Sequence, residues 1–342
     1  MSYRHANGNG CDDGKEFVME FTGIHSNHEL HRSGRFRISL GCMLLTVAIV
    51  FPSRVSRAGE VATPRATECC TRIVSMAPNI TELLYALDLG DRVIGVTPFC
   101  LYPLEATVKP KIGGFLDPNY EAILALKPDR IFGLSSHRDH RERLMKVGLD
   151  LTILPMNTIP EILSAITTVG SICGVEAPSA RLRESIEARM AELRNAPKRA
   201  MPVRVMICIG RDYQTDVLDQ VTIAGTDSFH DGIIELAGGI NAYRGPPIEY
   251  PAVSFEGILA MDPDVIVELR PGETMTEADR ERSLAAWLKP AGLRAAESHM
   301  ITIWTDPHVS IPGPRFIEIA EALAAIVREV RDGKEIPRVH MP

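Results

Sequence analysis

The chain has 342 residues, of which 45% are hydrophobic and 24% are charged, and its formal net charge is −7. This is the composition of an ordinary globular protein, and the length suggests about two domains. It argues against a nucleic-acid partner, because binding phosphates requires clustered Lys and Arg, and no dense basic block is present.

The N-terminus has the pattern of an export signal. HRSGRFR (31–37) supplies positive charge, ISLGCMLLTVAIVFP (38–52) supplies an apolar core, and VSRA (55–58) supplies small residues for cleavage. We therefore predict an exported protein whose signal is cleaved near Ala58. A retained membrane anchor is the alternative, although the apolar run is shorter than the roughly 20 residues that span a bilayer.

Two details of this leader are open. The polar residues 1–30 form a long lead-in, so Met19 is an alternative start. Cys42 in SLGC resembles the cysteine of a lipoprotein signal, but it precedes most of the apolar core instead of following it. We therefore do not expect lipidation at Cys42.

The cysteines carry no metal or redox motif. Cys11 and Cys42 leave with the predicted signal, and an odd number remains, so at least one thiol stays free or pairs between chains. Cys69 and Cys70 are adjacent and lack C-x-x-C spacing. We expect single thiols at the five remaining positions, which are Cys69, Cys70, Cys100, Cys173 and Cys208.

The first part of the predicted mature chain alternates β-rich runs with helical stretches, which predicts a β/α lobe with parallel strands. The helical stretch NITELLYAL (79–87) begins with Asn79 and Glu82 in capping-box spacing, so we expect its helix to start there. The strand candidates are Arg72–Met76, Arg92–Val96, Arg130–Leu134 and Leu151–Leu154.

A long charged helix then separates this lobe from a second β/α run. Residues 177–197 carry a single apolar stripe, and the later strand candidates include 203–210, 220–224, 265–269 and 300–304. An amphipathic helix over 314–330 closes the chain. The predicted division is a lead and signal over 1–58, a linker over 59–70, an N-terminal lobe over 71–176, a connecting helix over 177–197 and a C-terminal lobe over 198–342.

One phrase is written twice, once in each lobe. NYEAILALKPDRIF (119–132) and SFEGILAMDPDVIV (254–267) share seven of fourteen residues. Each begins with a polar residue that can cap a helix, continues with a first-turn Glu and an apolar face, and stops at Pro. Two copies do not make a repeat array, so the repetition indicates two similar lobes.

These phrases carry a family resemblance. From about Arg72 to Val327, the segments RIVSMAPNITELLYALDLGDRVIGVT, KIGGFLDPNYEAILALKPDRIF and YPAVSFEGILAMDPDVIV occur in a fixed order. They resemble the periplasmic binding proteins of ABC importers for vitamin B12 and iron–siderophores. The resemblance implies an α/β fold of two β/α lobes joined by a single long backbone helix, with a ligand cleft between the lobes.

The resemblance also implies a partner, a dimeric ABC permease with its ATPase. In the family each lobe presents a carboxylate to one half of that dimer, and the matching residues here are Glu121 and Glu256. A pseudo-symmetric protein that meets a symmetric dimer needs equivalent contacts on both lobes. The alternative is structural, because a Glu in the first turn of a helix is favoured by the helix dipole alone.

For the ligand, the resemblance implies a metal chelate, with cobalamin favoured and a ferric siderophore or haem as alternatives. Loops after the strands would line the cleft. Phe99, Phe115 and Tyr250 match aromatic positions of the B12 binder, whereas Leu134 and Ile209 stand where it has aromatics. Trp304 opens the last cleft loop and completes the candidate ligand-binding set.

Two other functions are weighed against this one. A zinc or manganese binder would use histidines from both lobes, and the candidates are His137, His140, His230 and His308. A secreted two-lobed α/β enzyme would need a catalytic motif, and the sequence has no G-x-G-x-x-G after its first strand, no P-loop and no H-E-x-x-H. We expect a monomeric binding protein without catalysis, cofactor or resident metal.

Overall fold

The structure is a computed structural model that describes residues 70–196, 202–215, 217–289, 291–337 and 339–340. The predicted signal, its cleavage site, Cys42 and Cys69 lie outside these residues. Among the residues described, no helix combines the length and the apolar character needed to cross a membrane.

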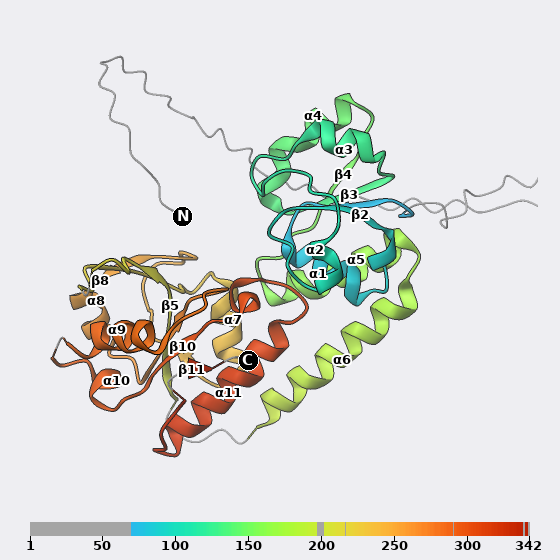
Figure 1. Cartoon of the computed structure of the whole chain (residues 1–342). Helices are drawn as coiled ribbons and strands as arrows, with labels where there is room; N and C mark the ends of the chain where they lie inside the picture. Colours follow the sequence, from blue (N-terminus) through green and yellow to red (C-terminus); the bar gives the residue numbers. More distant parts are fainter. Residues whose placement is uncertain (1–69, 197–201, 216, 290, 338, 341–342) are drawn as a thin grey trace, which may run out of the picture. The chain divides into compact units, whose positions relative to one another are not determined.

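The N-terminal lobe contains a parallel four-stranded sheet with the order β2-β1-β3-β4, as its alternating pattern predicts. Its strands are β1 (Ile73–Ser75), β2 (Val93–Val96), β3 (Arg130–Gly133) and β4 (Leu151–Ile153). Helices α1 (Pro78–Ala86), α3 (Tyr120–Leu126), α4 (Arg141–Lys146) and α5 (Ile159–Cys173) surround it (Figure 1).

The C-terminal lobe contains a mixed sheet. The strand order is β11-β10-β9-β5-β6-β8, and β7 pairs with β5 beside this path. The members are β5 (Arg204–Arg211), β6 (Gln220–Ile223), β7 (Ile240–Asn241), β8 (Ala252–Ser254), β9 (Val265–Leu269), β10 (Ile301–Trp304) and β11 (Val339–His340). Strands β5, β9, β10 and β11 are parallel, whereas β6 and β8 are antiparallel to their neighbours. Sequence reasoning missed the short strands β7, β8 and β11.

The remaining elements are short or cover this second sheet. They are α2 (Leu104–Thr107), α7 (Phe229–Leu236), α8 (Phe255–Met261), α9 (Glu277–Leu288), α10 (Arg294–Glu297) and α11 (Phe316–Arg331), with the 3-10 turns η1 (Gly90–Arg92), η2 (Ser135–His140) and η3 (Pro307–Ser310).

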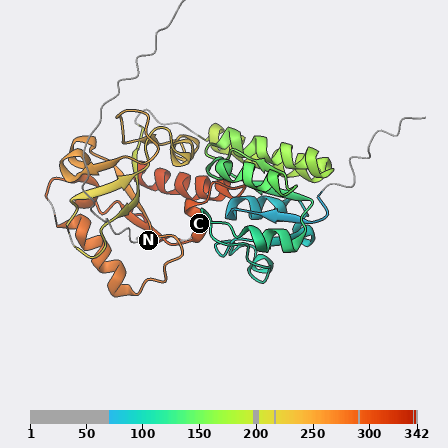
Figure 2. The same ribbon diagram turned by 90° about the horizontal axis from the view of Figure 1, so that it is seen from above.

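The connecting helix is α6, over Glu176–Asn195, and its 20 residues correspond to about 30 Å. It lies beside α5, as the two views show (Figures 1 and 2). Ile186 and Met190 are its buried apolar residues, and Arg189 forms a two-bond contact with Glu321 of α11 at 2.7 and 2.6 Å. The two sheets are therefore joined through one long helix, as the resemblance implies.

The core continues from one lobe into the other. One cluster of buried apolar side chains takes residues from α1 and α5, from α7 and α11, and from strands of both sheets. At the contact of α5 with α7, a Cβ on Gly232 would lie 3.2 Å from Cδ1 of Ile159, so the close packing of these helices favours glycine. The lobes are thus held by apolar packing as well as by α6.

The duplicated phrase folds in the same way twice. The side chain of Asn119 accepts a hydrogen bond from the backbone N–H of Ala122 at 3.0 Å, and Ser254 accepts one from Gly257 at 3.3 Å. Helix α3 is capped at its C-terminus by Lys127 and α8 by Asp262, both in the left-handed conformation, and each is followed by a proline that stops the helix. The predicted caps and stops are confirmed.

The shared Asp of the phrase has a role that the sequence did not reveal. The carboxylate of Asp129 accepts hydrogen bonds from the backbone N–H of Arg72 at 3.1 Å, just before β1. In the second lobe Asp264 accepts from the backbone N–H of Arg204 at 2.7 Å, at the start of β5. In each copy, the Asp therefore holds the start of the first strand of its own lobe through backbone hydrogen bonds.

The prediction of single thiols is wrong at two positions. Cys70 and Cys173 form a disulfide with an S–S distance of 2.13 Å across 103 residues of sequence. It ties the chain just before β1 to the end of α5. Cys100 and Cys208 are free and buried.

Candidate ligand site

Loops from the carboxyl ends of the two sheets meet each other. Asn79, which follows β1, donates a hydrogen bond through Nδ2 to the carbonyl of Pro312 at 3.1 Å, and Pro312 lies in the segment after β10. In α/β folds, ligands bind outside the carboxyl ends of parallel strands. The boundary between the lobes is therefore the candidate site.

A buried ion pair crosses this boundary. Arg315 donates from Nε and Nη2 to the two carboxylate oxygens of Glu82 at 3.0 and 2.7 Å. The side chain of Glu82 is 3% exposed and that of Arg315 is 18% exposed. Burial raises the pKa of Glu82, and the hydrogen bond and charge of Arg315 act against that rise. The Arg315 guanidinium also lies 3.8 Å from the ring centre of Tyr102.

This pair corrects the expectation for the start of α1. The helix begins at Pro78 with Ala77 as its N-cap, and no side chain caps it. Proline suits the first helical position because its missing N–H would have no partner there. Asn79 and Glu82 lie inside α1, are buried, and contact the other lobe instead.

The N-terminal lobe exposes apolar side chains after its strands. Phe99, Leu101 and Tyr102 follow β2, and Leu116 lies in the loop before α3; they are 44%, 61%, 50% and 61% exposed. We call these four residues the apolar patch. Large apolar side chains that are exposed close together in one loop, as Phe99, Leu101 and Tyr102 are, are typical of a binding surface.

The other predicted ligand residues of this lobe are less exposed. Phe115 is partly buried and packs edge-on against His137, with ring centres 4.7 Å apart. Leu134 directly follows β3 and is partly buried against the core. Phe99, Phe115 and Leu134 thus all come from loops at or beside the carboxyl edge of the N-terminal sheet.

In the C-terminal lobe the predicted residues differ in burial. Tyr250 is 42% exposed, and its ring centre lies 6.5 Å from that of the buried His230. Ile209 on β5 is partly buried. Trp304 is fully buried in the core that spans the lobes. Its ring therefore has no surface for a ligand in this structure.

The histidines do not assemble a metal site. His137 accepts from the backbone N–H of Leu134 at 2.9 Å and donates to the carbonyl of Phe115 at 2.8 Å, so both ring nitrogens are used. His230 donates to Val309, and burial lowers its pKa to about 4. Over the described ranges, no group of three His, Cys, Asp or Glu residues is arranged to hold a metal ion.

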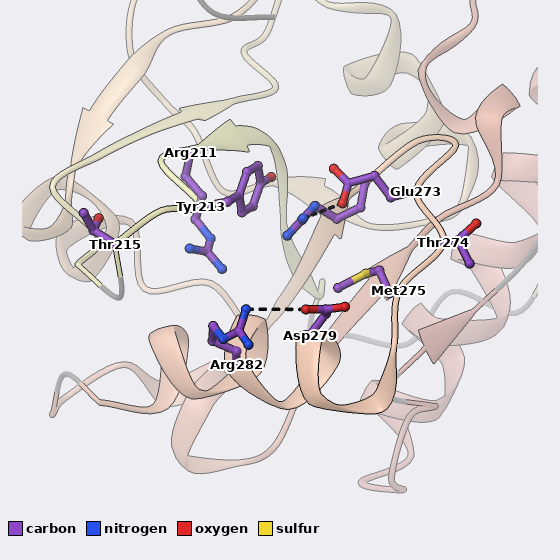
Figure 3. Close-up of a pocket in the computed structure, with 9 residues that line it drawn as sticks. Arg211, Tyr213, Thr215, Glu273, Thr274, Met275, Asp279 and Arg282 are labelled. Atoms are coloured by element: carbon purple, nitrogen blue, oxygen red, sulfur yellow. Dashed lines mark hydrogen bonds and ion pairs between the residues drawn. The ribbon is translucent and has the colours of Figure 1, made fainter.

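A pocket of about 260 Å³ lies at the carboxyl ends of β5 and β9 (Figure 3). We call it the strand-end pocket. Sequence reasoning named Ile209 of β5 as a candidate ligand residue but no residue of the loop after β9. The lining residues are Arg211, Tyr213, Thr215, Arg270, Glu273, Thr274, Met275, Asp279 and Arg282.

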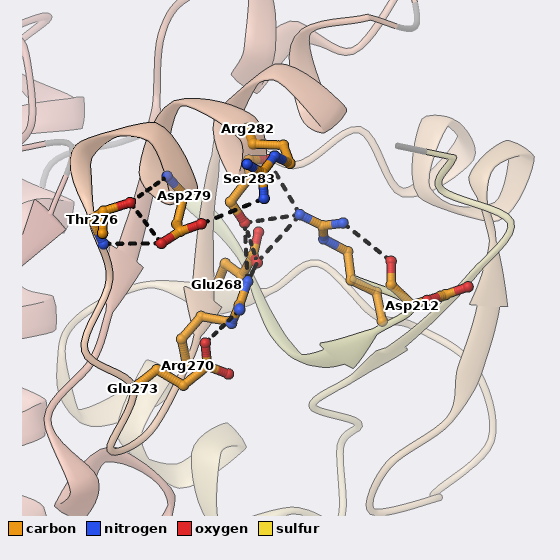
Figure 4. Close-up of polar contacts among 9 residues, drawn as sticks. Asp212, Glu268, Arg270, Glu273, Thr276, Asp279, Arg282 and Ser283 are labelled. Carbon is orange, nitrogen blue, oxygen red and sulfur yellow. Dashed lines mark hydrogen bonds and ion pairs between the residues drawn. The ribbon is translucent and has the colours of Figure 1, made fainter. Parts of the chain in front are cut away.

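A buried carboxylate lies beneath this pocket (Figure 4). Glu268 on β9 is fully buried and accepts hydrogen bonds from Ser283 at 2.7 Å and Trp287 at 2.5 Å. Its oxygen is also 3.4 Å from Arg211 and 3.6 Å from Arg270. Glu268 therefore fixes both guanidinium groups at the pocket, since a buried charge must be paired.

The rings and guanidinium groups of the pocket are stacked. The Arg270 guanidinium lies 3.7 Å from the ring centre of Tyr213, and that of Arg211 lies 4.7 Å from it. Burial raises the pKa of the Tyr213 hydroxyl, which keeps it protonated at neutral pH. This half of the boundary is polar, whereas the apolar patch of the other lobe is not.

The two Glu of the duplicated phrase occupy equivalent positions. Glu121 lies in the first turn of α3 and Glu256 in the first turn of α8, and both are exposed. Neither carboxylate has an ion-pair partner among the residues that the structure describes. Hydrogen bonds from its own backbone N–H and from Ser254 lower the pKa of Glu256, so it is ionised at neutral pH.

Comparison with known proteins agrees with this architecture. A vitamin B12-binding protein of Vibrio cholerae is 28% identical over 260 residues, which cover 75% of this chain and 89% of that protein. An uncharacterized ABC transporter substrate-binding lipoprotein of Bacillus subtilis is 26% identical over 264 residues, covering 74% and 78%. The periplasmic heme-binding protein of Roseiflexus sp. RS-1 superposes with a TM-score of 0.62 at 27% identity, covering 77% of this chain and 98% of that one.

The chain also matches a protein family. Residues 73–286 match the family described as periplasmic binding protein, and this range includes the N-terminal sheet, α6 and most of the C-terminal sheet. The chain therefore belongs to the periplasmic binding protein family.

Proposed function

We propose that this chain is an exported solute-binding protein that captures a metal-chelate nutrient and delivers it to an ABC permease. Cobalamin is the favoured ligand, and a ferric siderophore or haem is the alternative. The proposed export signal is the segment before Ala58, cleaved on secretion. Energy for transport comes from the partner ATPase, and no catalysis by this chain is proposed.

The observation that carries the proposal is the exposed apolar patch at the carboxyl edge of the N-terminal sheet. Phe99 and Tyr102 offer aromatic faces there, and Tyr250 offers another from the second lobe. Arg315 and Glu82 bring Tyr102 against the second lobe. Large aromatic faces suit a broad, partly apolar macrocycle. The named ligands of the relatives, vitamin B12 and heme, are of this type.

Isothermal titration calorimetry of the mature chain tests this function. We expect saturable binding of cyanocobalamin, or failing that of haem or a ferric siderophore, and no comparable binding of Zn²⁺. Replacing Phe99 and Tyr250 with Ala weakens binding by about 10- to 100-fold, because each lost aromatic contact removes roughly 0.5–1.5 kcal/mol beyond its buried area.

The matched control is Val108→Ala, which truncates an apolar side chain that is 84% exposed and lies outside the apolar patch. Its affinity should equal that of the wild type. Binding of Zn²⁺ alone, or turnover of a small substrate with no chelate binding, would contradict the proposed function.

We further propose that Glu121 and Glu256 dock the lobes onto the two halves of the permease. Charge pairs at such an interface govern orientation and association rate. Replacing both with Ala should leave ligand affinity unchanged and reduce ligand uptake by about tenfold or more, since two contacts with basic pockets are lost.

Uptake is measured in cells or proteoliposomes that contain the cognate permease. The matched control is Glu105→Ala, which removes another exposed first-turn Glu, in α2, outside the duplicated phrase. Full uptake by the double variant would return Glu121 and Glu256 to a structural role.

A further inference from the structure

The strand-end pocket opens at the sheet edge that contacts the other lobe. Strands β9 and β10 are parallel neighbours, with Leu269 opposite Trp304. The loops that follow them are joined by a hydrogen bond from the backbone N–H of Gly272 to the carbonyl of Thr305 at 2.8 Å. The segment after β10 then makes the contacts to the N-terminal lobe. The pocket is thus placed to receive the edge of a ligand held between the lobes.

The charges of this pocket cancel. Arg211 lies 3.4 Å from the buried Glu268, and Arg270 is paired with both Glu268 and Glu273. Arg282 lies 3.4 Å from Asp279 on the same helix. Three guanidinium groups therefore face three carboxylates, and every cation that lines the pocket already has an anion (Figures 3 and 4). A site built for a negative ligand would instead leave positive charge unpaired.

The strand-end pocket contains both hydrogen-bond donors and hydrogen-bond acceptors. The Tyr213 hydroxyl and the Nε atoms of Arg211 and Arg270 are buried without a hydrogen-bond partner among the described residues. Glu273 and Asp279 also line the pocket: Glu273 is exposed and accepts a hydrogen bond from Arg270, and Asp279 is half-buried and accepts from Thr276 and Arg282. The pocket thus combines donors that have no partner with carboxylate oxygens that accept hydrogen bonds.

We infer that the strand-end pocket binds an uncharged carboxamide on the ligand periphery and discriminates against a carboxylate, with Glu273 and Asp279 as the specificity-determining residues. The inference rests on the proposed function. A primary amide offers one acceptor and two donors, which matches the unpartnered donors and the carboxylate acceptors of the pocket. A carboxylate offers acceptors only, and it brings a negative charge toward the carboxylates of Glu273 and Asp279. Unfavourable contacts of this kind allow a binding site to reject a ligand that differs in one group.

The experiment compares ligands that differ in one group. Cyanocobalamin carries peripheral carboxamides, and its monocarboxylic acid derivatives replace one of them with a carboxylate. Calorimetric titration of the full mature chain at pH 7.5 should give at least about tenfold weaker binding for the acid derivative of the amide seated in the pocket, a change of roughly 1.4 kcal/mol. Equal or tighter binding of every acid derivative overturns the inference.

Variants assign the discrimination to the two residues. In Glu273→Gln with Asp279→Asn, Arg270 and Arg282 lose carboxylate partners, so the acid derivative should gain affinity and the preference for the amide should fall at least about tenfold. The matched control is Glu277→Gln, which neutralises an exposed carboxylate on α9 that pairs with Arg280 outside the pocket. An unchanged preference in the double variant overturns the assignment.

The outcomes separate this inference from the proposed function. Tight binding of haem or of a carboxylate-bearing ferric siderophore, without binding of cyanocobalamin, overturns the inference and leaves chelate capture intact. Binding of none of these ligands overturns both.

Discussion

Replacing Cys70 and Cys173 together with Ser should lower the free energy of unfolding by about 3–5 kcal/mol. The disulfide closes 103 residues of sequence, nearly the whole N-terminal lobe, so its loss frees a large loop in the unfolded chain. It also releases the segment before β1 from the end of α5. Urea unfolding monitored by circular dichroism measures the change, and reduction of the wild type with dithiothreitol should reproduce it.

The control for this experiment is the neighbouring cysteine, Cys69. Cys69→Ser changes the same residue type one position earlier and should leave the free energy of unfolding unchanged. Peptide mapping of the unreduced protein should recover Cys70 linked to Cys173. Equal stability of the wild type and the double variant under oxidising conditions would refute the role of this bridge.

Removing Arg315 should cost about 3–5 kcal/mol of stability, because it leaves the carboxylate of Glu82 buried without its partner. The control is Arg189→Ala, which breaks the pair with Glu321. That pair also has two hydrogen bonds, but its side chains are 34% and 39% exposed. An ion pair of that exposure contributes about 0–1 kcal/mol. The contrast between the variants therefore isolates the effect of burial.

The loss in Arg315→Ala should also depend on pH. Burial already raises the pKa of Glu82 above its ordinary value of 4.5, and removal of Arg315 raises it further. The folded state then holds a proton that the unfolded state releases, so this contribution is fully present below pH 4.5 and is lost as pH rises through the folded pKa. Unfolding at pH 5 and pH 8 tests this. A deficit that is equal at both pH values, or no larger than that of Arg189→Ala, would contradict the argument.

Local patterns were enough to predict most of the architecture. The ends of the strands in the N-terminal sheet lie within one residue of their predicted positions, because short β-rich runs are bounded by helical stretches. The caps Asn119 and Ser254 formed as expected, since a cap depends on residues two or three positions away. The helix caps and helix ends in both copies of the duplicated phrase are determined by residues that are close together in the sequence.

The features that escaped prediction join distant parts of the chain. Glu82 and Arg315 are separated by 233 residues, and the spacing of Asn79 with Glu82 matched a capping box equally well. The partner of Cys70 could not be predicted either, because it is distant in the sequence and any of several cysteines could have paired with Cys70. The strand-end pocket combines loops after β5 and β9, which only the sheet brings together.

The position of the disulfide has a consequence for biosynthesis. Both of its cysteines precede α6, so on the proposed export route they enter the oxidising compartment before any strand of the second lobe. The first lobe can then fold and be covalently closed while the rest of the chain is still being translocated. Arg315 follows β5 to β10 in the chain, so its ion pair with Glu82 joins the second lobe to a first lobe that is already covalently closed.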